Sequence, residues 1–278
     1  MQPRVFDKAL IGQHLRRRPR DRDDFVTRLV LDDLEERLAT ISRTFSRALI
    51  MGPDASLLPE TGRSTLGDFA FDRGATVLGD IDPEALVLPR EDYDLIVSIL
   101  DLQIINDVPG FLSRIRAHLA PDGLFIAAAI GGESLSELRQ AFLAAETEQR
   151  GGAHARVAPF IPRGEVGGLL QRAGFALPVS DVETHVVRYP DALALMRELK
   201  ALGASNPLAG RPDRPATRSL LASAAAHYAA MAADPDGRVR ATLEIVWMSG
   251  WAPHDSQQKP LKPGSAQVSL ASVLGRRP

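Results

Sequence analysis

The sequence predicts an α/β fold in which helices cover both faces of a mostly parallel sheet, with a late antiparallel strand. Apolar runs and amphipathic helical patterns alternate between about residues 48 and 150, and such alternation implies crossover connections between parallel strands. Tyr93–Leu100 and Leu124–Ile130 are almost continuously apolar, as strands buried on both faces require. Thr242–Trp251 is rich in β-branched and aromatic residues and adds the late strand.

The first predicted elements are a helix and a short strand. Phe25–Leu38 carries apolar side chains at the 3.6-residue period of an amphipathic helix. Ala48–Met51 is a short apolar run stopped by a Gly-Pro pair, which is typical of a buried strand that enters a turn. Thr65–Phe69 and Thr76–Gly79 are weaker strand predictions, and each lies beside an aspartate.

Helices and strands continue to alternate through the rest of the chain. A helix with Phe111 and Ile115 on one face ends at a Pro-Asp-Gly turn, which leads into the strand Leu124–Ile130. Ser134 and Glu137 have the spacing of a capping box, so a helix is expected directly after Ser134. Further helices are predicted at Glu165–Ala173, Ala192–Leu202 and Thr217–Met231, with a strand at Val179–Tyr189.

The composition is that of an ordinary globular protein. The chain has 278 residues, of which 45% are apolar and 24% charged. Its net charge of -2 gives no reason to expect binding to nucleic acid or to a membrane surface. No apolar run approaches the roughly 20 residues of a membrane-spanning helix, an apolar signal core is absent, and there is no cysteine. We therefore expect a cytoplasmic bacterial protein with no transmembrane segment.

The N-terminal part carries a basic cluster that acidic residues interrupt. We interpret it as a solvated, partly helical segment, because charge runs usually lie on the surface. The alternative is an arm that docks on an acidic partner. The cluster consists of Arg16, Arg17, Arg18, Arg20 and Arg22, with Asp21, Asp23 and Asp24 between and beside them.

Several segments resemble class I S-adenosylmethionine-dependent methyltransferases. Tyr93–Ser98, followed by Leu119–Phe125, is similar to the motifs that come after the cofactor loop in that class. A narrower resemblance is to the methyltransferase-like assembly factor of respiratory complex I and its alphaproteobacterial relatives. It rests on Phe6-Asp7 and on Asn106–Pro109, Gly131–Glu148, Val157–Phe160, Leu169–Phe175, Met196–Asn206 and Glu244–Ser265.

The resemblance implies a Rossmann-like class I methyltransferase fold, S-adenosylmethionine as cofactor, and a subunit of a respiratory complex as partner. In that family the mitochondrial member is thought to hydroxylate an arginine of a complex I subunit rather than to methylate it. No catalytic residue can be assigned, and no pair of histidines with a carboxylate has the spacing of an iron site. We expect no metal.

We interpret the whole chain, residues 1–278, as one methyltransferase-like domain. Residues 1–45 form an N-terminal helical segment, and residues 46–150 form a degenerate cofactor-binding half. Residues 151–253 form a substrate or cap half, and residues 254–278 form a polar tail.

The loop after the first strand departs from the methyltransferase pattern. That loop is normally rich in glycine, because only glycine lets the backbone approach a ligand closely. Gly52 matches the first glycine, but Ile50 stands where an acidic residue is usual, and Asp54 and Ser56 replace later glycines. Asp54 also places a carboxylate where that of the cofactor tends to lie, which is unfavourable unless Asp54 is turned away or paired.

Two aspartates are the candidate cofactor ligands that remain. By resemblance, Asp68 occupies the position that binds the ribose hydroxyls, and Asp80, followed by Ile81, the position that binds the adenine amino group. An alternative alignment puts Asp80 on the ribose and leaves the adenine position empty. Both aspartates could instead be strand-end or turn residues without a ligand. A crossover with its helix needs at least about 10–12 residues, so the short stretch from Gly52 to Asp80 predicts that at least one helix of this half is shrunken or lost.

Other candidates have simpler explanations. The six histidines share no metal-like spacing, and Trp247 and Trp251 are expected to pack in the core rather than face a substrate. Relatives carry a His-Trp pair where this chain has Gln103 and Ile104. Lys259 and Lys262 are either solubilising charges or a docking strip for a partner.

Two functions remain open from the sequence. The first is an enzyme that binds S-adenosylmethionine and modifies a protein or a small molecule, which rests on the family resemblance and on Asp68 and Asp80. The second is a pseudoenzyme in which the fold survives as a chaperone-like binding module for a respiratory subunit. It rests on Ile50, Asp54 and Ser56, and on the altered Gln103-Ile104 pair.

Overall fold

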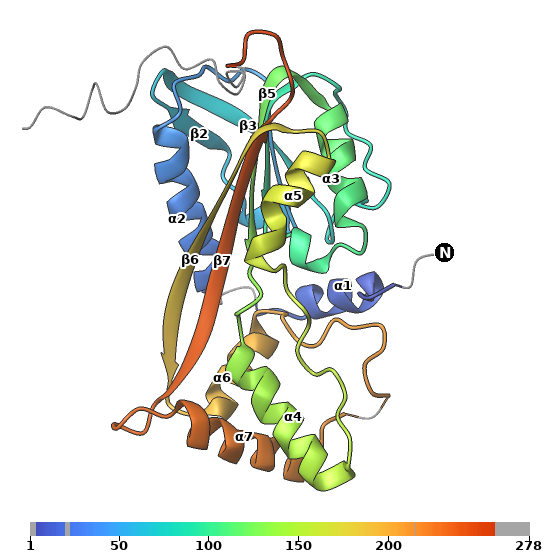
Figure 1. Cartoon of the computed structure of the whole chain (residues 1–278), viewed down its shortest axis with the longest axis vertical. Coiled ribbons are helices and arrows are strands. Elements are labelled where there is room, and N and C mark those ends of the chain that lie inside the picture. Colours follow the sequence, from blue (N-terminus) through green and yellow to red (C-terminus); the bar gives the residue numbers. More distant parts are fainter. Residues whose placement is uncertain (1–3, 20–22, 214, 259–278) are drawn as a thin grey trace, which may run out of the picture.

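A single sheet of seven strands organises the part of the chain that the structure, a computed structural model, describes: residues 4–19, 23–213 and 215–258 (Figure 1). The strand order is β2-β3-β1-β4-β5-β7-β6. The strands are β1 (Ala48–Gly52), β2 (Thr61–Ser64), β3 (Gly67–Ala75), β4 (Tyr93–Ile99), β5 (Leu119–Ile130), β6 (Ala176–Tyr189) and β7 (Val239–Trp251).

The pairing confirms the mostly parallel sheet. Strand β1 runs parallel to both β3 and β4, and β4 runs parallel to β5. The late strand β7 inserts antiparallel between β5 and β6, and β2 is antiparallel to β3 at the other edge. Strands β1 and β4 are almost entirely buried, in agreement with their continuous apolar sequences.

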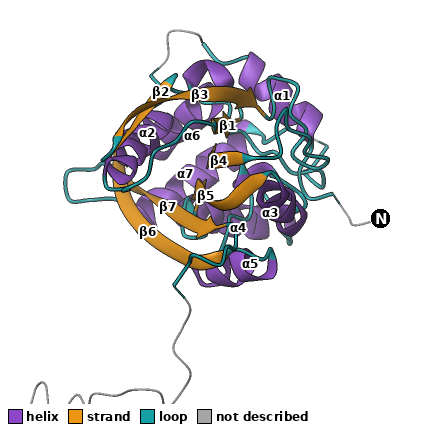
Figure 2. Ribbon diagram, turned by 90° about the horizontal axis from the view of Figure 1, so that it is seen from above, coloured by secondary structure: helices purple, strands orange, loops and turns teal. Residues whose placement is uncertain are grey.

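Helices cover both faces of the sheet, as expected (Figure 2). The helix α2 packs on one face through Val30 and Leu34, and α3 and α5 pack on the other. The helices are α1 (Lys8–Arg16), α2 (Phe25–Ala39), α3 (Val108–Ala117), α4 (Ser136–Arg150), α5 (Val166–Arg172), α6 (Ala192–Ala201) and α7 (Arg218–Ala232).

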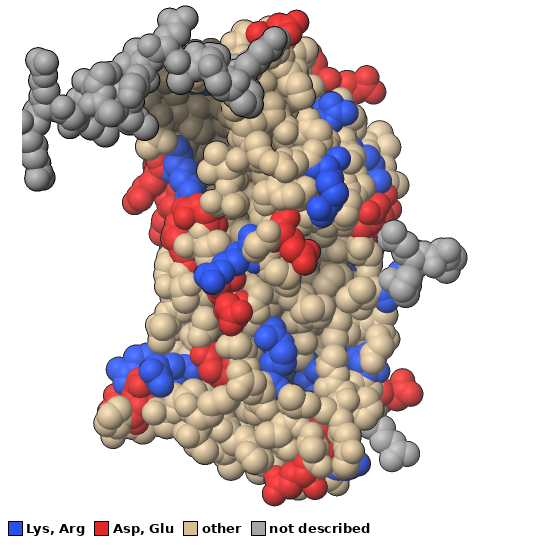
Figure 3. Space-filling view, in the orientation of Figure 1, with Lys and Arg blue, Asp and Glu red and all other residues tan. Residues whose placement is uncertain are grey.

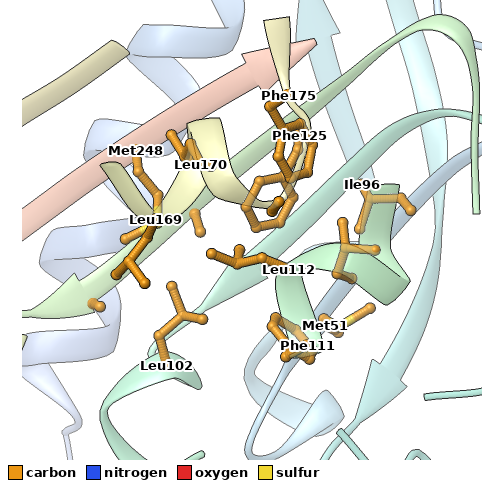
Figure 4. Packing of buried hydrophobic residues seen from close by; sticks show 14 of the residues in the cluster. Met51, Ile96, Leu102, Phe111, Leu112, Phe125, Leu169, Leu170, Phe175 and Met248 are labelled. Carbon is orange, nitrogen blue, oxygen red and sulfur yellow. The ribbon is translucent and has the colours of Figure 1, made fainter. Parts of the chain in front are cut away.

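The largest apolar cluster lies between the sheet and α3 and α5 (Figure 4). At its centre the rings of Phe125 and Phe175 stack with their centroids 5.4 Å apart. A separate cluster joins α4, α6 and α7 to the lower part of the β6–β7 ribbon, which extends past the other strands in Figure 1. Burial of both clusters holds the ribbon against the helices at each end.

The connection between β1 and β4 is strongly contracted. Residues 53–92 contain a short 3₁₀ turn (Ala55–Leu57) and the β2–β3 hairpin, and no α-helix. This confirms the predicted loss of a helix in the cofactor half. Of the two weak strand predictions, Thr65–Phe69 is partly right, because β3 begins at Gly67 and runs on to Ala75. Thr76–Gly79 is wrong, because these residues follow the end of β3.

The predicted capping box at Ser134 is also wrong. The helix α4 begins at Ser136, after Leu135 in the left-handed conformation. The Ser134 hydroxyl instead bonds the backbone of Glu244, accepting from its N–H at 2.8 Å and donating to its carbonyl at 3.1 Å. Glu137 accepts from the Thr242 N–H at 3.1 Å. Both motif residues therefore anchor α4 to β7.

Acidic and basic side chains are interspersed over the face shown in Figure 3. Of the basic N-terminal cluster, Arg16, Arg17 and Arg18 are described, and Arg16 belongs to α1. Arg20 and Arg22 lie outside the described residues, as do Lys259 and Lys262 of the predicted polar tail.

Candidate functional site

The candidate site lies between α1 and the ends of the parallel strands β1, β3 and β4. A pocket of about 370 Å³ opens there, within the size range of small-molecule sites. Its apolar walls come from α1, from the segment after β3 and from the turn after β4, and its polar groups include Lys8, Arg16 and Asp80. It is lined by Lys8, Ala9, Ile11, Gly12, Arg16, Thr76, Val77, Gly79, Asp80, Ile81, Asp82, Pro83, Ile104 and Ile105.

Gly52 ends β1, as the resemblance predicts, but it is covered by the chain itself. A Cβ atom on Gly52 would lie 3.1 Å from the Ile99 carbonyl oxygen and 3.2 Å from the Leu58 Cδ2 atom. The Gly52 carbonyl accepts hydrogen bonds from the Thr76 N–H at 2.9 Å and from the Thr76 hydroxyl at 3.2 Å. The close approach that glycine permits is therefore used by Leu58 and the end of β4, and Gly52 is not among the residues that line the pocket.

Asp54 is paired within the chain. Its carboxylate forms an ion pair with Arg18, and the two side chains are 17% and 16% exposed, respectively. It also accepts from the Ser56 N–H at 3.0 Å and from the Ser56 hydroxyl at 2.7 Å. The sequence required Asp54 to be either turned away from the site or paired, and the structure shows it paired. Its partner, Arg18, belongs to the basic N-terminal cluster.

Asp80 and Ile81 both line the pocket. The Asp80 side chain is exposed, and among the described residues it has neither a hydrogen-bond partner nor an ion-pair partner. The neighbouring Asp82 carboxylate pairs with Lys8 of α1, and the pKa of Asp82 is lowered by the hydrogen bond from Lys8. Asp80 is therefore a free hydrogen-bond acceptor at the mouth of the pocket.

Asp68 lies far from these residues. It is the second residue of β3, and the register pairs the last residue of that strand, Ala75, with Gly52. Seven residues of extended chain separate Asp68 from Ala75, or about 23 Å. The exposed Asp68 carboxylate accepts a 2.6 Å hydrogen bond from Arg63, which lowers its pKa. The structure does not bring Asp68 together with Gly52 and Asp80. The alignment that uses Asp68 for the ribose therefore places that carboxylate away from this edge, whereas the alignment that uses Asp80 for the ribose places its carboxylate at this edge.

A buried carboxyl group that the sequence analysis missed forms the floor of this edge. Asp101 follows β4 and is 0% exposed. Burial raises its pKa to about 7, against the opposing effect of hydrogen bonds with Thr76 and Ser98. The Ser98 hydroxyl donates to Asp101 Oδ2 at 3.1 Å, and Thr76 Oγ1 lies against Oδ1.

A protonated Asp101 satisfies all the hydroxyl groups around it. It can donate to Thr76 Oγ1, which leaves the Thr76 hydroxyl free to donate to the Gly52 carbonyl. An ionised Asp101 must instead draw the Thr76 hydroxyl away from Gly52. The hydrogen bonds from Asp101 to Thr76 and from Thr76 to Gly52 thus connect the ends of β4, β3 and β1. One sequence signal for it was an aspartate two residues after a mostly apolar, buried strand.

Gln103 joins the ends of β4 and β5. Its side-chain amide donates to the Leu100 carbonyl at 2.6 Å and accepts from the Ile130 N–H at 3.4 Å. Leu100 itself adopts a left-handed conformation with φ of 57°. Gln103 therefore joins two strand ends, and Ile104 forms part of the pocket wall.

Trp247 and Trp251 pack as expected. Trp247 is 3% exposed, and the Arg37 guanidinium lies 4.6 Å from the centre of its ring. Arg43 lies 5.1 Å from the ring centre of Trp251. Both tryptophans belong to the α2 side of the core, so they do not face the pocket.

In residues 4–19, 23–213 and 215–258, no group of three or more His, Asp or Glu side chains is arranged to hold a metal ion. Within the same ranges, no helix is long and apolar enough to cross a membrane.

The sheet order, the parallel β3-β1-β4-β5 set and the inserted antiparallel β7 define a Rossmann-like fold of the class I methyltransferases. No protein-family model matches the chain. Among solved structures, the YcgJ protein from a Bacillus aligns with 82% of this chain and 99% of its own, at a TM-score of 0.49 and 11% identity. The sequence relatives, and not this alignment, establish the family.

Arginine-hydroxylase NDUFAF5 of Danio rerio is 35% identical over 97% of this chain and 89% of its own length. The Homo sapiens protein of the same name is 35% identical over 90% of this chain and 76% of its own length. A malonyl-[acyl-carrier protein] O-methyltransferase of Halorhodospira halophila is 36% identical over 70% of this chain and 64% of its own length. The chain belongs to the family of arginine-hydroxylase NDUFAF5, which confirms the resemblance seen in the sequence.

The expectation of a cytoplasmic protein is wrong by the same comparison, because the NDUFAF5 relatives are named as mitochondrial proteins. The expectation rested on the absence of cysteine and of an apolar signal core. Neither feature distinguishes one reducing compartment from another.

The residues of the edge fit S-adenosylmethionine poorly on the side of β1. Leu58 fills the space beside Gly52, Ile50 is fully buried in place of an acidic residue, and Asp54 is held by Arg18. On the other side, Asp80 lies free at the pocket. The chain's own side chains therefore fill the loop after β1, whereas Asp80 remains available as a hydrogen-bond acceptor at the pocket.

Proposed function

We propose that this chain acts in the assembly of a respiratory complex as a protein-binding member of its family, without using S-adenosylmethionine as a methyl donor. The single observation that carries the proposal is the filled loop after β1, where Leu58 covers Gly52 and Arg18 neutralises Asp54. A cofactor bound there would have to displace Leu58 and also break the half-buried ion pair.

Two further features support the proposal. The hydrogen bonds of Thr76 with Gly52 and Asp101 close the ends of three strands without a ligand. Gln103 similarly ties β4 to β5 by two hydrogen bonds of its side chain. These hydrogen bonds pair the polar groups at the strand ends with groups of the protein itself, so this edge does not need a ligand to be stable.

Calorimetry with S-adenosylmethionine and with S-adenosylhomocysteine tests the cofactor part of the proposal. We expect no heat of binding up to millimolar ligand. Binding at micromolar concentration would contradict the proposal directly. Circular dichroism of the same sample shows whether the protein is folded, so that a silent titration can be interpreted.

The assembly role is tested separately in cells from which the chain has been deleted. Reintroducing the unmodified chain should restore the amount of assembled complex I, measured on native gels. Asp80→Ala should restore it equally well, because no ligand at Asp80 is required. If neither chain restores assembly, the protein has another role. If only the unmodified chain restores it, the pocket is needed.

The second candidate is an enzyme that binds a nucleoside in an altered way. The observation that favours it is the pocket of about 370 Å³ with Asp80 unpaired at its mouth. In this case S-adenosylhomocysteine binds, and Asp80→Ala abolishes the heat of binding. Asp68→Ala is the matched control, since the Asp68 carboxylate lies at the other end of β3 and pairs with Arg63.

A further inference from the structure

The strand β6 forms an open edge of the sheet. It has 14 residues, and among the described residues β7 is the only strand paired with it. Figure 1 shows it as the outer strand of the long ribbon, and Figure 2 shows it at the rim of the curved sheet. An edge strand of this length exposes a row of unpaired N–H and C=O groups, which natural proteins usually protect or pair with another chain.

The first part of β6 is protected and the second part is not. Pro178 lacks an N–H, and the Asp181 carboxylate accepts from the Val182 N–H at 2.8 Å. From Glu183 to Tyr189 there is no proline, glycine or lysine, and Val186 is 58% exposed. The stretch Glu183–Arg188 is therefore suited to pairing.

The direction of the free backbone groups follows from Val182. Its N–H points to a side chain at the edge and not to β7. In an antiparallel pair, successive residues alternate between bonding the partner strand and pointing away from it. The residues whose N–H and C=O groups point outward are therefore Val182, Thr184, Val186 and Arg188, and of these groups the Val182 N–H already bonds the Asp181 carboxylate.

The side chains of β6 match those of a second β6 best in one register. An antiparallel pair with Thr184 opposite Thr184 sets Glu183 opposite His185 and Val182 opposite Val186, each twice. Glu183 is 36% exposed and pairs with Arg37 at 2.6 Å, and His185 is 32% exposed and lies 3.7 Å from Glu183 of its own strand. Directly opposed β-branched pairs, here Val182 with Val186 and Thr184 with Thr184, stabilise antiparallel strands. In this register the residues that would exchange backbone hydrogen bonds between the two strands are those whose N–H and C=O groups point outward, such as Thr184 and Val186.

The neighbouring registers are worse. Centring the pair on Val182 sets Asp181 opposite Glu183, which opposes like charges. Centring it on Val186 sets Val182 opposite Pro190, which has no N–H to donate. We propose that this chain forms a two-fold symmetric dimer in which two β6 strands pair antiparallel about Thr184, joining two sheets into one. The proposal is independent of the function proposed above.

The absence of cysteine from the chain gives a direct test of register. In the dimer, two Thr184 Cα atoms lie about 5.5 Å apart, within the range that a disulfide spans. Under mild oxidation, Thr184→Cys should form a covalent dimer at twice the 30.1 kDa mass of the chain. Ser180→Cys is the matched control, because two Ser180 residues would be eight residues apart along the pair, or about 26 Å, and it should remain monomeric.

Sedimentation velocity of the unmodified chain gives the second measurement. We expect a dimer, and Val186→Lys should convert it to a monomer with an unchanged circular dichroism spectrum, because a lysine is placed opposite Val182. A monomeric unmodified chain overturns the proposal. So do a dimer that Val186→Lys leaves intact, and equal cross-linking of Thr184→Cys and Ser180→Cys.

Discussion

The two sides of the sheet's carboxyl edge differ in how much of the methyltransferase architecture they keep. On the β4–β5 side, residues 100–175 contain α3, α4 and α5, and α3 and α5 bury a large apolar cluster against the sheet. On the β1–β3 side, residues 53–92 contain a hairpin and a short 3₁₀ turn. Both sides share the same buried central strands, β1 and β4. The fold thus depends on the strands and on one set of helices, while the other connection can shorten.

The difference shows where constraint on the sequence comes from. A buried strand must be apolar on both faces, because unpaired polar groups are costly there. A loop at the carboxyl edge is constrained mainly by the ligand it binds. In this chain Asp54 stands in that loop and is held by hydrogen bonds from Arg18 and Ser56, so the loop is ordered by polar side chains rather than by glycines.

The largest effect is expected from removing a ring on the intact side. Phe125→Ala leaves a cavity beside Phe175 in a fully buried position, and it should lower the free energy of unfolding by about 3–5 kcal/mol. Phe69→Ala, on the contracted side, removes a ring that is 7% exposed and packs against Phe45 and Phe71. We expect a smaller loss there, because the short hairpin can relax into the space. Urea denaturation measures both, and equal losses would show that the two sides are equally well packed.

The next effect concerns the buried carboxyl group between the two sides. The pKa of Asp101 is raised from 3.8 to about 7 in the folded protein. The unfolded state therefore loses this proton between about pH 4 and pH 7 while the native state keeps it. Native stability falls over that range, and the cost is complete above pH 7. Asp101→Asn removes this cost and should raise the free energy of unfolding at pH 8 by up to about 4 kcal/mol.

Urea titrations of Asp101→Asn and of the unmodified chain at pH 5 and pH 8 check this expectation. The asparagine amide can donate to Thr76 and its oxygen can accept from Ser98, so the surrounding hydrogen bonds survive. The gain should shrink as the pH is lowered. An asparagine variant that is less stable at pH 8 would show that Asp101 is ionised and stabilising in the native state.

Much of the fold could be predicted from the sequence because its signals are local. The continuous apolar runs of β4 and β5 and the period of α2 depend only on which faces are buried. The position of Asp68 could not be predicted in the same way. Its position depended on whether Thr65–Phe69 lies at the end of a strand or at the beginning of one. In the structure β3 begins within this segment, because it pairs with β2 in a hairpin.

The candidate site was less predictable than the fold for a related reason. The sequence showed that Asp54 was out of place, but its partner Arg18 lies 36 residues away. Asp101 follows an apolar strand and becomes a buried acid only when Thr76, from another strand end, packs on it. Ser134 and Glu137 had a correct local motif, and residues of β7 competed for the same side chains. In each case the sequence showed the polar residue but not the partner, which lies far away in the sequence.

A smaller effect is expected from the ion pair between Arg18 and Asp54. Arg18→Ala leaves the Asp54 carboxylate half-buried with only Ser56 as a partner. It should cost about 1 kcal/mol, more than a surface pair and less than a fully buried one. Hydrogen exchange of α1 should speed up in this variant, because Arg18 connects the end of α1 to the β1 loop. Unchanged exchange would mean that the helix is held by its apolar contacts alone.

The smallest effect separates the two aspartates that the sequence treated alike. Asp68 and Arg63 form an exposed pair on neighbouring strands, with side chains 66% and 70% exposed, and such pairs contribute little to stability. Asp68→Asn should therefore leave the melting temperature unchanged within error, and it should not alter any nucleoside binding. Asp80→Asn should also leave the melting temperature unchanged, but any binding of S-adenosylhomocysteine that exists should weaken. If Asp68→Asn weakened binding instead, the ligand would lie at the amino end of β3, and the pocket beneath α1 would not be the site.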